Sequence, residues 1–271
     1  GADQLFAYSI ASTGALSALT PATLVTGANP VAVAASPVAR LVYVANGNST
    51  LAVFSYSSAG ALSQVGTPVT LAAVPRAIAI DPTGSFLYVA ASTNILEFDI
   101  GATGALTANP TSSPAAGSAP DALAFDPSGN HLLATNYAAS TLTLFSVDGT
   151  NHGALTTTGS SKSVGSTPTG IAVDAAGTHV YVSNGGGAGA SQVYAFTLTG
   201  NVLGDVSGSP FSVAPGVGPQ TVALDGGFAY TPNLSSDDVS RMTVNGSTGV
   251  LGTASTTPAG DGPADMVFAN P

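Results

Sequence analysis

The 271-residue sequence predicts an all-β fold made of repeated four-stranded units. Three observations support this prediction. Similar segments recur with a period of about 45 residues, each repeat divides into four short apolar runs, and no stretch shows sustained helical periodicity. The 33 glycines and 18 prolines are spread along the whole chain, as the turns between many short strands require.

Each repeat begins with a proline, and a first strand, A, follows it. The opening residues are Pro30, Pro75, Pro120, Pro168, Pro219 and Pro263, at intervals of 44 to 51 residues. Strand A is a run of small apolar residues, such as AIAI after Pro75 or ALAF after Pro120. Continuous apolar runs of this length are typical of inner strands that are buried on both faces.

A turn and a second strand, B, come next in each repeat. An aspartate lies six residues after the proline in four repeats, and a glycine follows it two or three residues later (Asp81, Asp126, Asp174 and Asp225). Aspartate caps such turns with its carboxylate, while glycine tolerates a positive φ. Strand B then carries a large residue at one equivalent position: Tyr43, Tyr88, Leu133, Tyr181 and Tyr230.

Strands C and D complete the repeat. Strand C has one aligned large residue (Tyr8, Phe54, Phe98, Phe145, Phe196 and Met242), and strand D starts at a leucine after a glycine-containing turn. Four short strands in about 45 residues are the signature of a β-propeller blade. The sequence therefore predicts a single β-propeller domain over residues 1–271, with about six four-stranded antiparallel blades starting near residues 30, 75, 120, 168, 219 and 263.

The sixth predicted blade is split between the two ends of the sequence and lacks one strand. Residues 263–271 match strand A, and residues 1–29 match strands C and D, so residues 1–29 complete the blade that begins at 263. Three explanations stay open: a longer parent chain, a three-stranded closing blade, or a strand supplied by another subunit. An unpaired strand edge is a template for another chain, so self-association is one expectation.

The composition excludes several classes of function. Charged residues make up 7% of the chain, and fourteen acidic against four basic residues give a net charge of -10, which argues against nucleic-acid binding. The longest weakly polar run, residues 30–46, is broken by Pro37 and Arg40 and matches two strands, so no membrane insertion is expected. The absence of cysteine excludes disulfides and a thiol nucleophile. We expect no cofactor and no metal.

The repeat resembles a known family. Pro75 followed by AIAIDPTGSFLYVA, a third strand such as LTLFSV and a turn such as TGAL are similar to the lactonase-family propellers. These are seven-bladed 6-phosphogluconolactonase-like proteins, related to YVTN-type surface repeats. The resemblance extends over essentially the whole chain. It implies the propeller fold and the capacity to hydrolyse a lactone, although propellers host many unrelated activities.

Polar residues are expected to gather at one mouth of the propeller. One group follows the opening prolines and includes Arg76, Asp121 and Gln220; the other ends strand B and comprises Asn46, Asn136, Asn184 and Asn233. In one hypothesis they bind a neutral ligand such as a sugar or lactone, with Arg76 contacting an oxyanion or carboxylate and Asp121 acting as general base. In the other, the asparagines cap turns and Arg76 pairs with Asp121.

The remaining polar residues have mainly structural interpretations. His131, His152 and His179 are expected to face solvent, and Glu97 and Asp99 are expected on an exposed blade face. Asn48, Asn233 and Asn245 match the Asn-x-Ser/Thr glycosylation pattern, which would place them in outward-facing loops.

Two functions therefore remain. The sequence favours a non-catalytic secreted or cell-surface propeller that binds a surface polymer or glycan or assembles with itself, because it has few ionisable groups to cluster in a cleft. The alternative is a lactonase-like hydrolase that acts on a sugar lactone at the channel mouth. An extracellular, cell-surface or periplasmic location is expected in either case.

Overall fold

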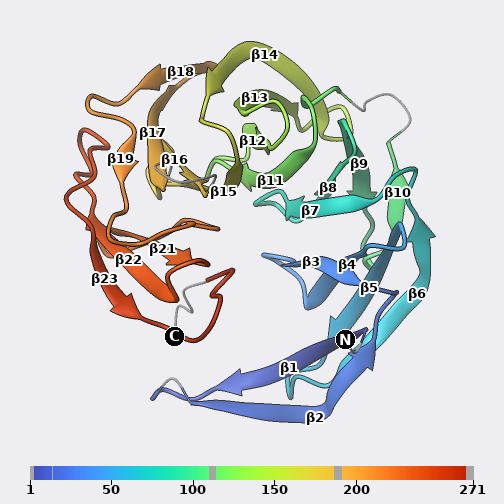
Figure 1. Ribbon diagram of the computed structural model, residues 1–271. Coiled ribbons are helices and arrows are strands. Elements are labelled where there is room, and N and C mark those ends of the chain that lie inside the picture. Colours follow the sequence, from blue (N-terminus) through green and yellow to red (C-terminus); the bar gives the residue numbers. More distant parts are fainter. Residues whose placement is uncertain (1–2, 14, 110–113, 186–190, 267–271) are drawn as a thin grey trace. The chain divides into compact units, whose positions relative to one another are not determined.

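The computed structural model describes residues 3–13, 15–109, 114–185 and 191–266, and its elements are shown in Figure 1. Strands without helices make up the regular structure of these residues. They form six antiparallel sheets, of which four have four strands, one has five and one has two. Repeated four-stranded antiparallel sheets are the blades of a β-propeller, so the predicted fold class is confirmed.

Strands pair in chain order within each blade. The first complete blade contains β3 (Pro30–Ala35), β4 (Leu41–Asn46), β5 (Thr50–Tyr56) and β6 (Leu62–Thr70), and the second contains β7 (Pro75–Ile80), β8 (Phe86–Ala91), β9 (Asn94–Ile100) and β10 (Leu106–Ala108). The third contains β11 (Pro120–Phe125), β12 (His131–Asn136), β13 (Thr141–Asp148) and β14 (Ala154–Ser163). The fourth contains β15 (Pro168–Val173), β16 (His179–Asn184), β17 (Gln192–Thr199) and β18 (Val202–Asp205), with β19 (Phe211–Ser212) pairing β17. The fifth contains β20 (Ala223–Asp225), β21 (Phe228–Asn233), β22 (Asp238–Thr243) and β23 (Ser255–Pro258).

The predicted blade starts agree with these strands. Four first strands begin at the predicted prolines, and in the fifth blade Pro219 forms an isolated bridge with Asn233 before β20 begins. The turn after strand A forms as expected, because Asp81 accepts hydrogen bonds from the backbone N–H groups of Ser85 (2.8 Å) and Phe86 (2.7 Å). Asp126 and Asp174 cap the corresponding turns in the same way.

The core consists of apolar side chains on the faces of the blades. Tyr43, Tyr88 and Tyr181 in the second strands are fully buried, and so are nearly all of the aligned strand-C residues, for example Phe54 and Phe145. Burying such a side chain contributes roughly 1.5 to 3 kcal/mol to stability. Tyr8 is the exception among the aligned residues, since 48% of it is exposed.

Two compact units divide the chain. Unit 1 comprises residues 1–113, 149–154 and 271, and unit 2 comprises residues 114–148 and 155–270. The turn Gly149–Ala154, which connects β13 to β14, thus groups with unit 1. The side-chain contacts of the candidate site lie within one unit or the other. The single domain expected from the sequence stays a prediction.

The two-stranded sheet contains β1 (Gln4–Ile10) and β2 (Leu16–Val25), which match strands C and D of the repeat. Pro263–Met266 carry no strand, and residues 267–271, where most of the predicted strand A lies, are outside the described residues. The closing of a sixth blade between residues 263 and 29 therefore stays a prediction. No helix in the described residues has the length and apolar character needed to cross a membrane.

Candidate functional site

The two groups of predicted polar residues lie at the same end of each blade. The opening proline of strand A is the register partner of the residue that ends strand B, as in Pro30–Asn46, Pro120–Asn136 and Pro168–Asn184. In the second blade Pro75 is paired with Ala91. This end of the blade, with its B–C turn and the loop that leads into strand A, is called the proline end below.

The asparagines of the proline end are buried and hold the adjacent turns. Asn136 Nδ2 donates to the hydroxyl oxygens of Thr141 (3.1 Å) and Thr143 (2.9 Å). Asn233 Nδ2 donates to Ser240 Oγ (2.8 Å) and to the carboxylate of Asp238 (2.6 Å). Asn46 bonds Thr50, and Asn184 bonds Val164 and Thr167. These contacts are those of the capping hypothesis, and a ligand contact by these amides stays a prediction.

A glycine three residues before the opening proline lies against each of these asparagines. A Cβ on Gly117 would come within 2.6 Å of Cγ of Asn136, so no larger residue fits there without a shift. The other such pairs are Gly27–Asn46, Gly165–Asn184 and Gly216–Asn233. The second blade has alanine at both positions, Ala72 and Ala91. Our sequence reasoning missed this pairing, although the spacing Gly-x-x-Pro followed by an asparagine at the end of strand B signals it.

The candidate catalytic residues lie at the second position of strand A. Arg76 is exposed on β7 in unit 1, and Asp121 is half-buried on β11 in unit 2. Because each is described within its own unit, their joint action stays a prediction. In unit 2 the equivalent Thr169 donates its hydroxyl to the carbonyl of Pro219 (3.2 Å), and Gln220 Nε2 donates to the carbonyl of Gly218 (3.1 Å).

The three histidines each lie beside an aspartate. The Nδ1 to Oδ2 distances are 3.5 Å for His131–Asp126, 2.7 Å for His152–Asp99 and 2.9 Å for His179–Asp174. The solvent-facing prediction holds for His152, whose side chain is 64% exposed. It is wrong for His179, which is buried, and for His131, whose side chain is mostly covered. The aspartate that caps the A–B turn also contacts the imidazole of the first residue of strand B, and so draws it inward.

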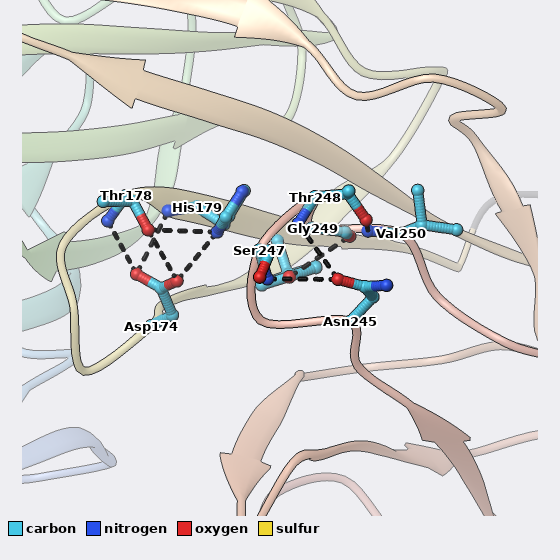
Figure 2. A network of polar contacts seen from close by, with 9 residues as sticks. Asp174, Thr178, His179, Asn245, Ser247, Thr248, Gly249 and Val250 are labelled. Carbon is cyan, nitrogen blue, oxygen red and sulfur yellow. Dashed lines mark hydrogen bonds and ion pairs between the residues drawn. The ribbon is translucent and has the colours of Figure 1, made fainter.

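Figure 2 shows this arrangement for Asp174, Thr178 and His179, beside the turn that contains Asn245 and Gly249. Burial acts to raise the pKa of Asp174, but hydrogen bonds donated by His179 and Thr178 outweigh it and lower the pKa below 3.8. Gly249 packs against the imidazole ring of His179. The Asp174–His179 pair packs against this turn, at the end of the blade opposite the opening prolines, and thereby stabilises the turn.

The prediction that Glu97 lies on an exposed blade face is also wrong. Glu97 is only 3% exposed. The turn Gly149–Ala154 covers this part of the second blade, since its carbonyl groups accept hydrogen bonds from Tyr88 (2.7 Å) and from Asn109 Nδ2 (3.2 Å). Asn109 Nδ2 also donates to Glu97 Oε2 (3.3 Å). Among the described residues, no three His, Asp or Glu side chains gather as a metal site requires.

The three glycosylation candidates differ in exposure. Asn48 and Asn245 are exposed, whereas Asn233 is buried and hydrogen-bonded, which contradicts the outward-facing position expected for it. Modification at any of them stays a prediction.

These features define an all-β propeller with polar, well-braced blade ends. The family model described as a lactonase, seven-bladed β-propeller matches residues 1–169, more than half of the chain, and the chain therefore belongs to this family. No curated protein sequence matches the chain.

Solved structures agree in fold. A Lactobacillus plantarum protein has a TM-score of 0.78 at 21% identity, over 89% of this chain and 75% of that one. The Pseudomonas aeruginosa periplasmic gluconolactonase has a TM-score of 0.76 at 18% identity, over 89% and 73%. A putative 6-phosphogluconolactonase from Bacteroides uniformis has a TM-score of 0.77 at 19% identity, over 95% and 78%. The family match favours the lactonase-like alternative over the non-catalytic function that the sequence favoured, whereas these neighbours show the fold alone.

Proposed function

We propose that this protein is a carboxylic ester hydrolase that opens a sugar lactone. The observation that carries the proposal is membership of the lactonase propeller family over residues 1–169. The fold shared with the Pseudomonas aeruginosa periplasmic gluconolactonase supports it, and the periplasmic source of that protein favours the periplasm among the expected locations. Fractionation of the native cells tests the location.

Hydrolysis of a lactone requires particular catalytic groups, and the residues at the proline end can be compared with them. Water attacks the lactone carbonyl, the oxygen of that carbonyl becomes an oxyanion, and the ring C–O bond breaks as the leaving oxygen takes a proton. A general base and donors to the oxyanion each lower the barrier. Asp121 is the proposed base. Thr169 and Gln220 follow Pro168 and Pro219 in the same unit, and their donor groups already bond backbone carbonyls. Their side-chain oxygens are the proposed acceptors for sugar hydroxyls.

Replacement of the proposed base tests this assignment. Asp121→Asn keeps the shape of the side chain and removes its basicity, so we expect turnover of glucono-δ-lactone to fall by about 100-fold or more, the range of general-base contributions. Initial rates in a pH-stat, corrected for spontaneous hydrolysis, measure it. Asp225→Asn is the matched control, because Asp225 is an exposed aspartate of the same unit at the A–B turn, and its turnover should be unchanged.

The outcomes separate the site from the activity. If the wild-type chain turns over the lactone and Asp121→Asn does so at the same rate, Asp121 is rejected as the general base, while the proposed hydrolase function stands. A wild-type rate no higher than the buffer rate, for glucono-δ-lactone and for a panel of other sugar lactones, would reject the proposed function. Arg76→Ala, assayed in parallel, tests the predicted anion contact independently.

A further inference from the structure

Asparagine followed by glycine occurs three times in the chain, and one of these pairs has different surroundings from the other two. The pairs are Asn46–Gly47, Asn184–Gly185 and Asn245–Gly246. Asn46 and Asn184 are buried at the proline end, whereas Asn245 is exposed in the turn between β22 and β23. In such a pair the glycine leaves the backbone nitrogen beside the side-chain amide unshielded. The surroundings of each pair thus decide whether the nitrogen and the amide react with each other.

The backbone nitrogen of Gly246 is the first distinguishing feature. In the two buried pairs the glycine N–H is already bonded, since Gly47 donates to the carbonyl of Asn29 (2.6 Å) and Gly185 to the carbonyl of Thr167 (3.3 Å). Gly246 N–H donates to no group among the described residues, and no described atom would lie within 4 Å of a Cβ on this glycine. This N–H therefore faces water, which can remove its proton.

The amide nitrogen of Asn245 is the second distinguishing feature. Asn46 Nδ2 donates to Thr50 Oγ1 (3.1 Å), and Asn184 Nδ2 donates to the carbonyl of Val164 (3.0 Å). Asn245 Nδ2 makes no hydrogen bond with the residues that the structure describes. An amide nitrogen that is held by an acceptor inside the protein leaves less readily than one that is exposed to water, so Asn245 alone presents a free leaving group.

The amide oxygen of Asn245 is held by two backbone donors. Oδ1 accepts hydrogen bonds from the N–H groups of Ser247 (3.1 Å) and Thr248 (3.1 Å), as Figure 2 shows. Such donors stabilise the negative charge that forms on the oxygen when a nucleophile attacks the amide carbon, as in an oxyanion hole. Asn184 Oδ1 also accepts two hydrogen bonds, from Thr167. The nucleophile and the leaving group, rather than this polarisation, therefore separate Asn245 from Asn184.

We propose that Asn245 is a modification site at which the turn converts asparagine to aspartate and isoaspartate without an enzyme. Gly246 N loses its proton and forms a bond to Asn245 Cγ; the Cγ–Nδ2 bond then breaks, and Nδ2 takes a proton from water and leaves as ammonia. Water opens the resulting cyclic succinimide. Cleavage of the new N–Cγ bond gives aspartate, and cleavage of the original peptide C–N bond gives isoaspartate. The proposal is independent of the proposed hydrolase.

The two products affect the turn differently. Aspartate keeps the backbone and accepts the same two N–H groups with a charged oxygen, which strengthens those hydrogen bonds. Isoaspartate adds a carbon atom to the main chain between Val244, which forms a bridge with Leu251, and Gly249. The carbonyl of Gly249 accepts a hydrogen bond from Tyr181 (3.2 Å), and Gly249 packs against His179. Isoaspartate therefore loosens the turn from β16.

Peptide mapping by mass spectrometry, after incubation of the chain at mildly alkaline pH, tests the proposal with Asn46 and Asn184 as internal controls. In the folded chain Asn245 should lose ammonia about tenfold or more faster than either control, because the buried glycine N–H groups must first break a hydrogen bond. In guanidinium chloride the three rates should converge. Equal rates at the three sites of the folded chain, or a lower rate at Asn245 in the folded than in the unfolded chain, would overturn the proposal.

A change at Ser247 tests the role of the amide oxygen. Ser247→Pro removes one of the two N–H donors to Oδ1 and should slow the reaction at Asn245 by about 100-fold, the effect of a single oxyanion donor. Ser247→Ala keeps the N–H and should react at the wild-type rate. Matching melting temperatures show that both variants are folded. An unchanged rate in Ser247→Pro would contradict the proposal that the turn activates the amide.

A change at Gly246 tests the consequence for the turn. Gly246 lies outside the left-handed region and has open space at its Cβ position, so Gly246→Ala fits the fold while its methyl group hinders the nitrogen. Under conditions that convert the wild type, this variant should keep its ammonia and its melting temperature. The melting temperature of the wild type should fall as isoaspartate accumulates, and Asn245→Asp should melt at or above the temperature of the fresh wild type. Isoaspartate at Asn245 without such a fall would refute the loosening of the turn.

Discussion

Three tyrosines at one position of strand B differ in what their buried hydroxyl groups contact. Tyr88 donates to the carbonyl of Gly153 (2.7 Å) and Tyr181 to the carbonyl of Gly249 (3.2 Å), and both carbonyls belong to glycine-containing C–D turns. The hydroxyl of Tyr43 is buried and has no hydrogen-bond partner among the residues that the structure describes. Burial raises the pKa of Tyr43 to about 12, so this hydroxyl stays neutral.

Removing each hydroxyl should therefore have different effects on stability. Tyr88→Phe and Tyr181→Phe each leave a carbonyl unpaired, so we expect a loss of about 1 to 3 kcal/mol in the free energy of unfolding. Tyr43→Phe removes an unsatisfied polar group and should be neutral or stabilising by up to about 1 kcal/mol. Urea denaturation measures all three. A loss for Tyr43→Phe as large as that for Tyr88→Phe would show that the contact with the turn is not the cause.

Asp174 gives the stability a defined dependence on pH. Its pKa in the folded chain is lowered below the ordinary value of 3.8, since the hydrogen bonds from His179 and Thr178 outweigh the effect of burial. A carboxylate with a lowered folded pKa stabilises the fold above its unfolded pKa, and this contribution disappears as the pH falls through the folded pKa. The stabilisation should thus be complete at neutral pH and be lost below about pH 4.

Asp174→Asn isolates this contribution. The difference in melting temperature between the wild type and the variant should be largest near pH 7 and shrink as the pH is lowered below about 4. Thermal melts from pH 7 to pH 3 measure it. Gly200→Ala is the control, because it changes no titratable group, and its difference from the wild type should not vary with pH in this way. A constant difference for Asp174→Asn would mean that the charge of the carboxylate is not what stabilises the turn.

At the scale of elements, a C–D turn can pack against strand B of another blade within the same unit. Gly153 has a φ of +69° and lies against Tyr88 and Phe86 of the preceding blade. A Cβ there would overlap the phenol oxygen of Tyr88 and the ring of Phe86. The glycine that the sequence marks as a turn residue is therefore also required by the close approach of the turn to Tyr88 and Phe86.

Gly153→Ala should destabilise the chain more than the same change in an open turn. Gly200, in the turn between β17 and β18, has a φ of +53°, and no described residue would come within 4 Å of a Cβ there. Gly200→Ala therefore measures the backbone strain alone, about 1 to 2 kcal/mol. Gly153→Ala adds overpacking, which costs roughly 1 to 3 kcal/mol more. Urea denaturation of both variants gives the difference. Equal losses of unfolding free energy in the two variants would show that Gly153 is required only for its own backbone conformation.

At the scale of the whole molecule, the charge balance bears on the substrate. The four basic residues are Arg40, Arg76, Lys162 and Arg241. Lys162 pairs with Asp205 (2.8 Å), and Arg241 lies over the ring of Phe228 (4.7 Å to the centroid). A chain of net charge -10 repels anionic substrates, because the summed field of the protein acts on their approach.

The proposed hydrolase should therefore prefer a neutral lactone. We expect kcat/KM for glucono-δ-lactone to exceed that for its 6-phosphate by about tenfold or more, the lower end of electrostatic effects on association. Added salt should raise the value for the phosphorylated substrate and leave the neutral one unchanged, since salt screens the repulsion. Rates at several ionic strengths measure both. A preference for the phosphate that salt weakens would reveal a cationic subsite instead.

Much of the fold was predictable because its determinants are local. Pro75, Asp81 and the glycine after it fix a strand start and a turn within about ten residues, and this spacing recurs in three other repeats. The positions that were mispredicted depend on distant segments. Glu97 is buried because the turn Gly149–Ala154 covers it, and His179 is buried beside a turn about 70 residues further on. The alternation of apolar and polar residues along one strand identifies the two faces of that strand. It does not show which other segments pack against each face.

The candidate site likewise combines features that the sequence predicts with features that only the tertiary structure shows. The sequence alone determined the class of fold, the blade boundaries and the shared end of the blades at which Asp121 and the asparagines lie, since backbone pairing follows from the repeat. Only the tertiary structure decided that the asparagines are buried among turn hydroxyl groups and glycines, that each histidine has an aspartate beside it, and that Glu97 is buried. These outcomes depend on which side chains neighbouring blades bring together, and such contacts join residues that no short stretch of sequence contains.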